Sequence, residues 1–302
     1  MSLYNAYLTL SGALDTEVVS DERLSLRTTY RIGGPAALTV TAHTYPALAR
    51  AIDVLDHERV SWVVLGRGSN LLVADSGYDG CVVRLGREFS RISFEETTQV
   101  SAGAAVVLSR LVSECQSEGL SGLEVCVGIP GTVGGAVSMN AGTRSEWIGR
   151  VVTSVVTFAP GTGLRRHDGA EIEWGYRTTS IPATEIILEA SFSLELADPT
   201  DISNEMERRL SRRRRRQPIG RPTCGSVFKN PPGKSAGELI ESCGLKGAVF
   251  GGAQISETHA NFVVNNGSAT ALDVLAAMRR MHDAVQERYG IDLVPEVKYL
   301  GF

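Results

Sequence analysis

The chain has 302 residues, of which 43% are hydrophobic and 21% charged, and a net charge of −4. This composition is typical of a globular protein, and a chain of this length usually divides its core, so we expect two or three subdomains. No apolar run approaches the roughly 18 residues that span a bilayer, and residues 1–15 lack the basic region of a signal peptide, so we expect a cytoplasmic protein without a membrane partner.

The first predicted elements alternate between strand and helix. A helix at 45–57 can be capped by Thr44 and carries Leu48, Ile52 and Leu55 on one face. A second helix at 107–117 ends at Gly119. Between and around them, β-prone runs predict strands at 38–41, 62–65, 81–85, 91–94 and 99–102.

The second half of the chain predicts long strands followed by helices. A strand at 151–158 leads through a turn at 160–163 to the next strand, and 185–196 is another long strand. After Pro199 an amphipathic basic helix runs to Arg216, where prolines break it and a third unit begins. The last helices are expected at 236–243 and 271–289. Gly290 stops the final helix, whose apolar side is predicted to carry Leu275, Met278, His282, Val285 and Tyr289.

Positive charge is concentrated between Arg208 and Arg221, where eight arginines occur without an acidic residue. Without those charges the net charge of −4 becomes about −12, which argues against a nucleic-acid partner. The arginine run is either a solvated helix end or a local attractor for an anionic small substrate. Among residues 212–216, Arg216 is the candidate for substrate binding.

Cysteine and histidine spacing gives no support for a metal site or a disulfide framework. The five cysteines are scattered, with no C-x-x-C pair, and the five histidines show no ligand spacing. We therefore expect reduced, mostly buried cysteines and no bound metal.

Two glycine-rich loops are the most informative feature of the sequence. Residues 128–142 combine glycines with Ile129, Val133, Val137 and Met139, which a flexible surface linker would not contain. Glycine lets backbone N–H groups converge on an anion without a Cβ in the way. A second loop at 66–70 lies between two apolar runs, so this region is predicted to form a strand, a tight turn and a second strand. A dinucleotide with an extended pyrophosphate is the simplest ligand that would need both loops.

Neither loop matches the common nucleotide fingerprints. The G-x-G-x-x-G pattern at a strand-to-helix junction is missing, because more strand follows Gly68. Gly233-Lys234-Ser235 has the ending of a P-loop, but the first glycine of that motif is replaced by Phe228 and prolines interrupt the amide cradle. An ATPase is therefore disfavoured.

The order of the motifs resembles the UDP-N-acetylenolpyruvoylglucosamine reductase family, also called UDP-N-acetylmuramate dehydrogenases. The resemblance covers roughly residues 24–302. It is carried by the two loops and by ordered segments, which are Thr28-Thr29-Tyr30-Arg31-Ile32-Gly33-Gly34-Pro35-Ala36, Trp174-Gly175-Tyr176-Arg177, Gly225-Ser226-Val227-Phe228-Lys229-Asn230-Pro231, Gly251-Gly252-Ala253-Gln254-Ile255-Ser256, His259-Ala260-Asn261-Phe262 and Pro295-Glu296-Val297.

This resemblance implies an α+β fold with two FAD-binding subdomains of the vanillyl-alcohol-oxidase (PCMH) type and a C-terminal α+β substrate-binding domain. We assign residues 1–23 to an N-terminal leader, 24–75 and 76–198 to the two FAD subdomains, and 199–302 to the substrate domain, with the last strand returning to the active site. Only residues 178–184 separate Arg177 from the next strand, so the chain is similar to the shorter form of the family, which lacks an inserted tyrosine loop.

The implied activity is the NADPH-dependent reduction of UDP-N-acetylglucosamine enolpyruvate to UDP-N-acetylmuramate, a step of peptidoglycan precursor synthesis. FAD would be bound noncovalently, NADPH would donate the hydride, and the protein would act as a monomer. The cofactor-binding residues are expected in the two loops. They are Gly66, Arg67, Gly68, Ser69, Asn70, Gly128, Ile129, Pro130, Gly131, Thr132, Gly134, Gly135, Ala136, Asn140, Ala141 and Gly142.

Three residues are implied to carry the chemistry. Arg177 would stabilise negative charge on the substrate carboxylate, because a guanidinium is always charged and its fork fits that group. Ser226 would donate a proton to C2, and Glu296, within an otherwise apolar strand, would hydrogen-bond or shuttle protons. The purely structural alternatives are a surface ion pair for Arg177, a turn residue for Ser226 and a sheet-edge carboxylate for Glu296.

Other site residues follow from the same motifs. Tyr176 would orient the substrate, although a core aromatic is an alternative, and Lys229 and Asn230 would contact its phosphate, carboxylate or sugar groups. His259 is only a candidate neighbour of the site, because a lone histidine usually has a structural role.

Two rival functions remain open from the sequence. One is another FAD oxidoreductase of this fold acting on a hydroxy acid or alcohol, and the other is a non-catalytic module that binds flavin or a nucleotide sugar.

Overall fold

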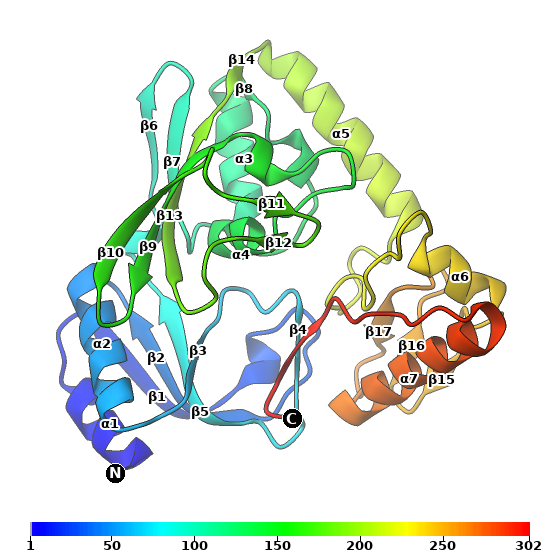
Figure 1. Ribbon diagram of the computed structural model, residues 1–302, viewed down its shortest axis with the longest axis horizontal. Helices are drawn as coiled ribbons and strands as arrows, with labels where there is room; N and C mark the ends of the chain where they lie inside the picture. The colour runs from blue at the N-terminus through cyan, green and yellow to red at the C-terminus, as the bar shows by residue number, and fades with distance from the viewer. Residues whose placement is uncertain (1) are drawn as a thin grey trace. The chain divides into compact units, whose positions relative to one another are not determined.

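The computed structural model describes residues 2–302 and confirms the α+β class (Figure 1). The chain forms two compact units. The first contains the residues up to Ser20 together with Leu38–Gly66 and Gly80–Ser211, and the second contains Asp21–Ala37, Arg67–Asp79 and Arg212–Phe302. Within residues 2–302, no helix has the length and apolar character needed to cross a membrane.

An antiparallel sheet of five strands forms the centre of the first unit, in the order β10-β9-β13-β7-β6. Alternate residues of β13, from Ile186 to Phe192, are buried, as expected for a strand with one face in the core. The helices α3 and α4 pack against this sheet through a shared apolar core. The elements are β6 (Ile92–Glu96), β7 (Gln99–Gly103), α3 (Leu108–Ser117), α4 (Val133–Ser138), β9 (Val152–Ala159), β10 (Gly163–Asp168) and β13 (Ile186–Ser193).

A second core of the first unit surrounds helix α2 (Tyr45–His57). Thr44 caps this helix by accepting a hydrogen bond from the amide of Ala47, and the predicted face of Leu48, Ile52 and Leu55 is fully buried. The helix α1 (Leu3–Ser11), whose Ala6 and Leu10 enter the same core, was not predicted. The associated sheet has the order β1-β2-β5-β3, with β1 (Thr16–Arg23), β2 (Pro35–Ala42), β3 (Trp62–Val64) and β5 (Tyr78–Leu85).

The runs on either side of the 66–70 loop form strands, as predicted. β3 pairs with β5, whereas β4 (Leu71–Val73) pairs in parallel with β18 (Lys298–Leu300), so the two strands are not paired with each other. One strand prediction needs correction. The long strand expected at 185–196 is interrupted at Leu194. Its end, β14 (Glu195–Leu196), pairs with β8 (Leu120–Ser121) and leaves the main sheet.

The second unit packs helices on a small sheet, β15-β16-β17. The helix α7 (Ala271–Tyr289) begins with a capping box between Thr270 and Asp273 and ends at Gly290, which has the left-handed conformation at φ 64°. The other elements are α6 (Ala236–Ser242), β15 (Val249–Phe250), β16 (Ala253–Ile255) and β17 (Val263–Asn265), while α5 (Pro199–Arg216) begins in the first unit and ends in the second.

The buried face of α7 differs from the predicted one. Met278 and Val285 are buried as expected, but Leu275 and His282 are only half-buried and Tyr289 is exposed. The core instead receives Val274, Ala277, Met281 and Ala284. The predicted face was therefore rotated relative to the observed one, which includes the alanines at 277 and 284 as well as larger side chains.

The remaining elements are short. They are the 3-10 turns η1 (Leu24–Leu26), η2 (Glu88–Ser90), η3 (Glu124–Cys126) and η4 (Ile148–Arg150), and the hairpin strands β11 (Trp174–Gly175) and β12 (Thr178–Thr179).

Candidate active site

The two glycine-rich loops meet at Gly66 and Thr132 in the first unit. A Cβ atom on Gly66 would lie 2.7 Å from Oγ1 of Thr132, which is closer than side-chain atoms pack. The Thr132 hydroxyl also accepts a hydrogen bond from the amide of Gly135 and caps α4. Gly66 is therefore required for the close approach of the two loops.

The backbone amides of residues 131–135 divide into two groups. The protein itself uses the amides of Val133 and Gly134, which donate to the carbonyls of Val106 and Ala104 at 2.9 Å, and the amide of Gly135 as described above. Gly131 and Thr132 are buried, and within residues 2–302 their amides make no hydrogen bond to another group. Buried amides are almost always satisfied, so this pair calls for an acceptor from outside the chain.

These observations fit a dinucleotide cofactor. Glycines remove side chains where the loops meet, Gly128 and Gly131 adopt φ values of 72° and 140° that favour glycine, and two buried amides are available to an anionic oxygen. The residues that would hold FAD here are those of the two loops. Of the other members of the predicted set, Arg67 and Ser69 lie in the first loop, Ile129 and Pro130 precede α4, Ala136 lies within it, and Asn140 and Ala141 follow it.

The first loop continues into the second unit. Gly68 packs against the backbone of residues 27 and 28, where a Cβ would lie 2.9 Å from the carbonyl oxygen of Arg27. Asn70 holds the last strand segment by two bonds. Its Nδ2 donates to the carbonyl of Glu296 at 3.1 Å, and its own carbonyl accepts from the amide of Lys298 at 3.0 Å. The predicted cofactor residue Asn70 therefore fixes the backbone that carries Glu296.

Tyr176 and Arg177 form the two-residue turn of the β11–β12 hairpin in the first unit, where Gly175 pairs with Thr178. Arg177 has a positive φ of 58°, and its guanidinium lies 5.3 Å from the centre of the Tyr176 ring. Nη1 of Arg177 donates to the carbonyl of Gly142 at 3.0 Å. Arg177 is half-buried, and Tyr176 is 39% exposed.

Ser226 and Glu296 are neighbours in the second unit. The segment from Ser226 lies between two others, since Ser226 bridges Phe262 and Phe228 bridges Pro295. The amide of Glu296 donates to the carbonyl of Val227 at 2.8 Å, so Glu296 is bonded to the residue next to Ser226. Glu296 is buried and Ser226 half-buried, and Gly225 before Ser226 has a φ of 86°.

Asn261 is a structural residue whose role was not predicted from the sequence. Its Oδ1 accepts from the amide of Phe228 at 3.1 Å and its Nδ2 donates to the carbonyl of the same residue at 2.8 Å. Its burial inside an apolar core could have been inferred only from its place between Ala260 and Phe262. This pair of bonds fixes the strand that carries Ser226.

Of the predicted substrate residues, Tyr176 lies in the first unit, and Arg216, Lys229 and Asn230 lie in the second. The amide of Lys229 donates to the carbonyl of Val294, and Oδ1 of Asn230 accepts from the amide of Ala236 at the start of α6. Arg216 is the exposed last residue of α5.

His259 packs against the backbone of α6, where a Cβ on Gly237 would lie 2.7 Å from its ring. Burial, with help from the charge of Lys246, lowers the pKa of His259, so the ring is neutral at pH 7. Its Nδ1 accepts a hydrogen bond from the amide of Asn261 at 3.2 Å. These contacts support the structural alternative for this histidine.

Not all arginines of α5 are available to an anion. Arg209 makes two bonds to Glu146, at 2.8 and 3.1 Å, and a further bond to Glu205. Hydrogen bonds from Arg208 and Arg209 to Glu205, together with the charges of both arginines, outweigh burial and hold the pKa of Glu205 at about 2. Arg209 thus ties α5 to the loop that follows Gly142.

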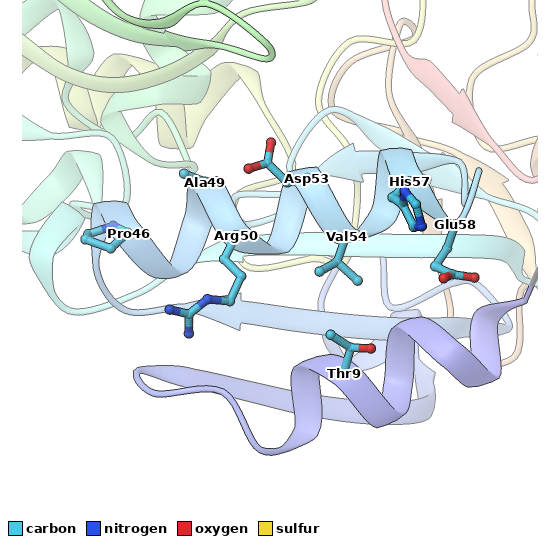
Figure 2. A pocket seen from close by; sticks show the side chains of 8 residues that line it. All are labelled: Thr9, Pro46, Ala49, Arg50, Asp53, Val54, His57 and Glu58. Carbon is cyan, nitrogen blue, oxygen red and sulfur yellow. The ribbon is translucent and has the colours of Figure 1, made fainter.

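A separate cavity of about 700 Å³ lies beside α1 and α2 (Figure 2). The predicted cofactor, catalytic and substrate residues do not line it. Its walls are Thr9 from α1 and seven residues of the α2 region, which are Pro46, Ala49, Arg50, Asp53, Val54, His57 and Glu58.

The described residues contain no group of three potential metal ligands. Four of the five cysteines are buried, and burial raises the pKa values of Cys81, Cys115 and Cys224 to about 12. These three thiols stay protonated and are poor nucleophiles.

Comparison with known proteins agrees with these features. A family model described as an FAD binding domain matches residues 36–160, and one described as the C-terminal domain of UDP-N-acetylenolpyruvoylglucosamine reductase matches residues 217–300. The chain is 39% identical over 292 residues to the reductase of that name from Syntrophotalea carbinolica, and 41% identical over 293 residues to that of Geobacter sulfurreducens. Both alignments cover 97% of each chain.

A solved structure gives the same result. The model matches the crystal structure of UDP-N-acetylenolpyruvylglucosamine reductase from Thermus caldophilus with a TM-score of 0.81 and 38% sequence identity, covering 94% of this chain and 98% of the other. On this similarity over nearly the whole length, the chain belongs to the UDP-N-acetylenolpyruvoylglucosamine reductase family.

Proposed function

We propose that this protein is the FAD-dependent reductase that converts UDP-N-acetylglucosamine enolpyruvate to UDP-N-acetylmuramate with NADPH. The observation that carries the proposal is the near full-length similarity to reductases named for this substrate, at about 40% identity. The cofactor assignment has independent support from the match of residues 36–160 to an FAD binding domain and from the two buried amides at Gly131 and Thr132.

FAD held by the loops at 66–70 and 128–142 would supply the hydride for C3 of the enolpyruvyl group, with NADPH as the source of that hydride. The protein must hold the substrate, stabilise the negative charge that spreads onto its carboxylate and deliver a proton to C2. We assign these tasks to Arg177, Ser226 and Glu296. The two loops at 66–70 and 128–142 are assigned to the cofactor.

Arg177 is assigned to the substrate carboxylate. Its guanidinium remains charged throughout the working pH range, and its planar fork can donate two parallel hydrogen bonds to a carboxylate. The hairpin turn and the bond to Gly142 hold this side chain in place before substrate arrives. A preorganised charge of this kind stabilises the transition state without reorganisation during the reaction.

Ser226 is assigned as the proton donor to C2. A serine hydroxyl is a weak acid, so its proton must be released next to a cation or be replaced through a relay. Lys229, three residues further along the same segment, can supply the charge. The paired backbone bonds of Asn261 to Phe228 give the segment the rigidity that a proton donor needs.

Glu296 is assigned to the same proton-transfer system. It is buried, and its backbone is bonded to Val227 on one side and to Asn70 on the other. A carboxyl group in such a place can accept or return a proton through a hydrogen bond.

For the remaining substrate contacts we propose Tyr176, Arg216, Lys229 and Asn230. We also propose that residues 24–75 and 76–198 form the two FAD-binding subdomains and residues 199–302 the substrate-binding domain, with residues 1–23 as an N-terminal leader. We also propose that the enzyme works as a cytoplasmic monomer in cell-wall precursor synthesis, and through it in cell shape and division, with no nucleic-acid partner.

The proposal is tested by following the flavin. The purified protein should show a flavin absorption band, and NADPH should bleach it when air is excluded. Addition of UDP-N-acetylglucosamine enolpyruvate should then restore the band with formation of UDP-N-acetylmuramate. Rapid reoxidation by air with no response to this substrate would indicate an oxidase, and an unbleached flavin would indicate a binding module. Either result would overturn the proposal.

A further inference from the structure

The side chain of Asn140, placed in a cofactor loop, is turned into the protein. It is only 4% exposed, its Nδ2 donates to the carbonyl of Gly175 at 2.9 Å, and its Oδ1 accepts from the amide of Gly149 at 3.2 Å. One partner is an acceptor and the other a donor, so only this orientation of the amide satisfies both. Asn140 therefore joins three separate backbone segments of the first unit.

One partner of Asn140 lies in the base of the Tyr176–Arg177 hairpin, and the other, Gly149 of η4, packs against that base. Gly175 is the last residue of β11 and stands two residues before Arg177. Gly149 is covered by the indole of Trp174, because a Cβ at this glycine would lie 2.3 Å from the ring. Asn140 thus holds the hairpin directly at Gly175 and indirectly through the surface on which Trp174 rests.

A second bond joins the same two segments at the tip of the hairpin. The guanidinium of Arg177 donates to the carbonyl of Gly142, two residues after Asn140. Gly142 has a φ of 156°, and a Cβ there would lie 2.3 Å from the carbonyl oxygen of Glu146, so the position requires glycine. The loop at 140–142 therefore contacts the base and the tip of the hairpin together.

Backbone strain occurs at both ends of this connection. Among residues 2–302, six non-glycine residues have a positive φ, and Asn140 at 43° and Arg177 at 58° are two of them. Each such residue costs about 1 kcal/mol or more and persists where surrounding contacts enforce it, often at functional sites. The bonds of Asn140 and Arg177 are the contacts that enforce it here.

We propose that Asn140 is a positioning residue that aims the guanidinium of Arg177 at the substrate carboxylate. The inference rests on the proposed function, because it concerns the step in which Arg177 acts. It assigns Asn140 a task in the reaction with the enolpyruvyl substrate and not in the reaction with NADPH. Because small displacements of a positioned group can cost up to about 100-fold in rate, the effect should be measurable.

The test uses the holoenzyme with Asn140→Asp. Aspartate tolerates a positive φ and can still accept from Gly149, but it places an oxygen against the carbonyl of Gly175 and loses that bond. In anaerobic stopped-flow measurements we expect normal FAD content and flavin reduction by NADPH within about twofold of the wild type, with flavin reoxidation by the substrate slowed about tenfold or more. Loss of FAD with a normal reoxidation rate after reconstitution would overturn the proposal and make Asn140 a cofactor ligand.

A double-mutant cycle with Arg177→Lys identifies the residue through which Asn140 acts. If Asn140 works by aiming Arg177, then Asn140→Asp should slow reoxidation much less in the Arg177→Lys protein than in the wild type. Equal fold losses in both proteins would overturn the proposal. If Asn140→Asp does not fold, Asn140→Gly removes both side-chain bonds and relieves the backbone strain, and the same comparison applies.

Thr157→Val is the matched control. It removes a different buried hydrogen bond of the first unit, from Oγ1 of Thr157 to Glu185. We expect it to lower the melting temperature without slowing reoxidation, and an equal slowing in this variant would overturn the proposal. Failure of the proposed function is a separate result, because the wild-type flavin would then not be reoxidised by the substrate at all.

Discussion

Gly66 and Thr132 approach so closely that a Cβ on Gly66 would lie 2.7 Å from the threonine hydroxyl. We predict that Gly66→Ala separates the two loops and weakens FAD binding. Overpacking of this kind costs about 1–3 kcal/mol, and 1.4 kcal/mol corresponds to about a tenfold higher Kd. Titration of the apoprotein with FAD, followed by flavin fluorescence, measures the effect.

Gly12→Ala is the control for this change, because a Cβ added at Gly12 would meet no other heavy atom within 4 Å and the φ of Gly12 is −101°. The double variant Gly66→Ala, Thr132→Ala removes the hydroxyl in the clash and should regain part of the affinity. Equal FAD affinity in Gly66→Ala and Gly12→Ala would show that the loops need not touch.

Removal of the Ser226 hydroxyl should separate the two halves of the reaction. We predict that Ser226→Ala binds FAD and oxidises NADPH normally but reduces the enolpyruvyl substrate roughly 100-fold more slowly, the scale of a lost general acid. Stopped-flow absorbance of the flavin resolves both steps. Ser203→Ala, an exposed serine on α5, should leave both steps unchanged. Normal turnover of Ser226→Ala would remove Ser226 from the mechanism.

We predict that lysine cannot perform the function of Arg177, although the two side chains carry the same charge. The ammonium is a point charge without the planar fork, so it cannot donate two parallel bonds to a carboxylate. For Arg177→Lys we expect an unchanged flavin spectrum and a kcat lowered about tenfold or more. The control is Arg150→Lys, since Arg150 also lies on an aromatic ring, 4.4 Å from the centre of Trp147. A normal kcat for Arg177→Lys would contradict the proposed role.

Glu185 should make the stability of the first unit depend on acid pH. Its side chain is 2% exposed. Burial alone would raise its pKa, but bonds from Thr157, His167 and Arg165 outweigh burial and lower it below 4.5. A carboxylate with a lowered pKa stabilises the fold fully above its unfolded value and loses that contribution as the pH falls through the folded value.

The measurement is urea unfolding of wild type and Glu185→Gln between pH 3 and 7. The difference in unfolding free energy should be largest above about pH 5 and shrink as the pH falls. A difference that stays constant over this range would show that the charge of Glu185 is not responsible.

Sequence patterns predicted the elements that have local signals. The helices α2 and α7 were correctly placed because Thr44 and Gly290 mark their ends, and α5 because its composition changes at Pro199. The short helix α4 was missed, since glycine-rich segments have low helix propensity and only packing on the sheet stabilises it.

Tertiary contacts explain what the sequence could not predict about the site. Asp75 lies two residues after β4, yet its carboxylate accepts bonds from the amides of Ala271 and Leu272 at the start of α7. Residues so far apart in sequence leave no local pattern. In the same way, the glycine content of 128–142 predicted a cofactor loop but gave no sign that Asn140 turns inward to Gly175.

The parallel pairing of β18 with β4 affects the order in which the protein can fold during synthesis. Leu71 pairs with Lys298 and Val73 with Leu300, so one partner leaves the ribosome long before the other. Until translation reaches β18, the backbone edge of β4 has no permanent partner, and such an edge is a site of aggregation. We expect nascent chains stalled before residue 298 to depend on chaperones. The second unit should complete its folding only after β18 has been synthesised.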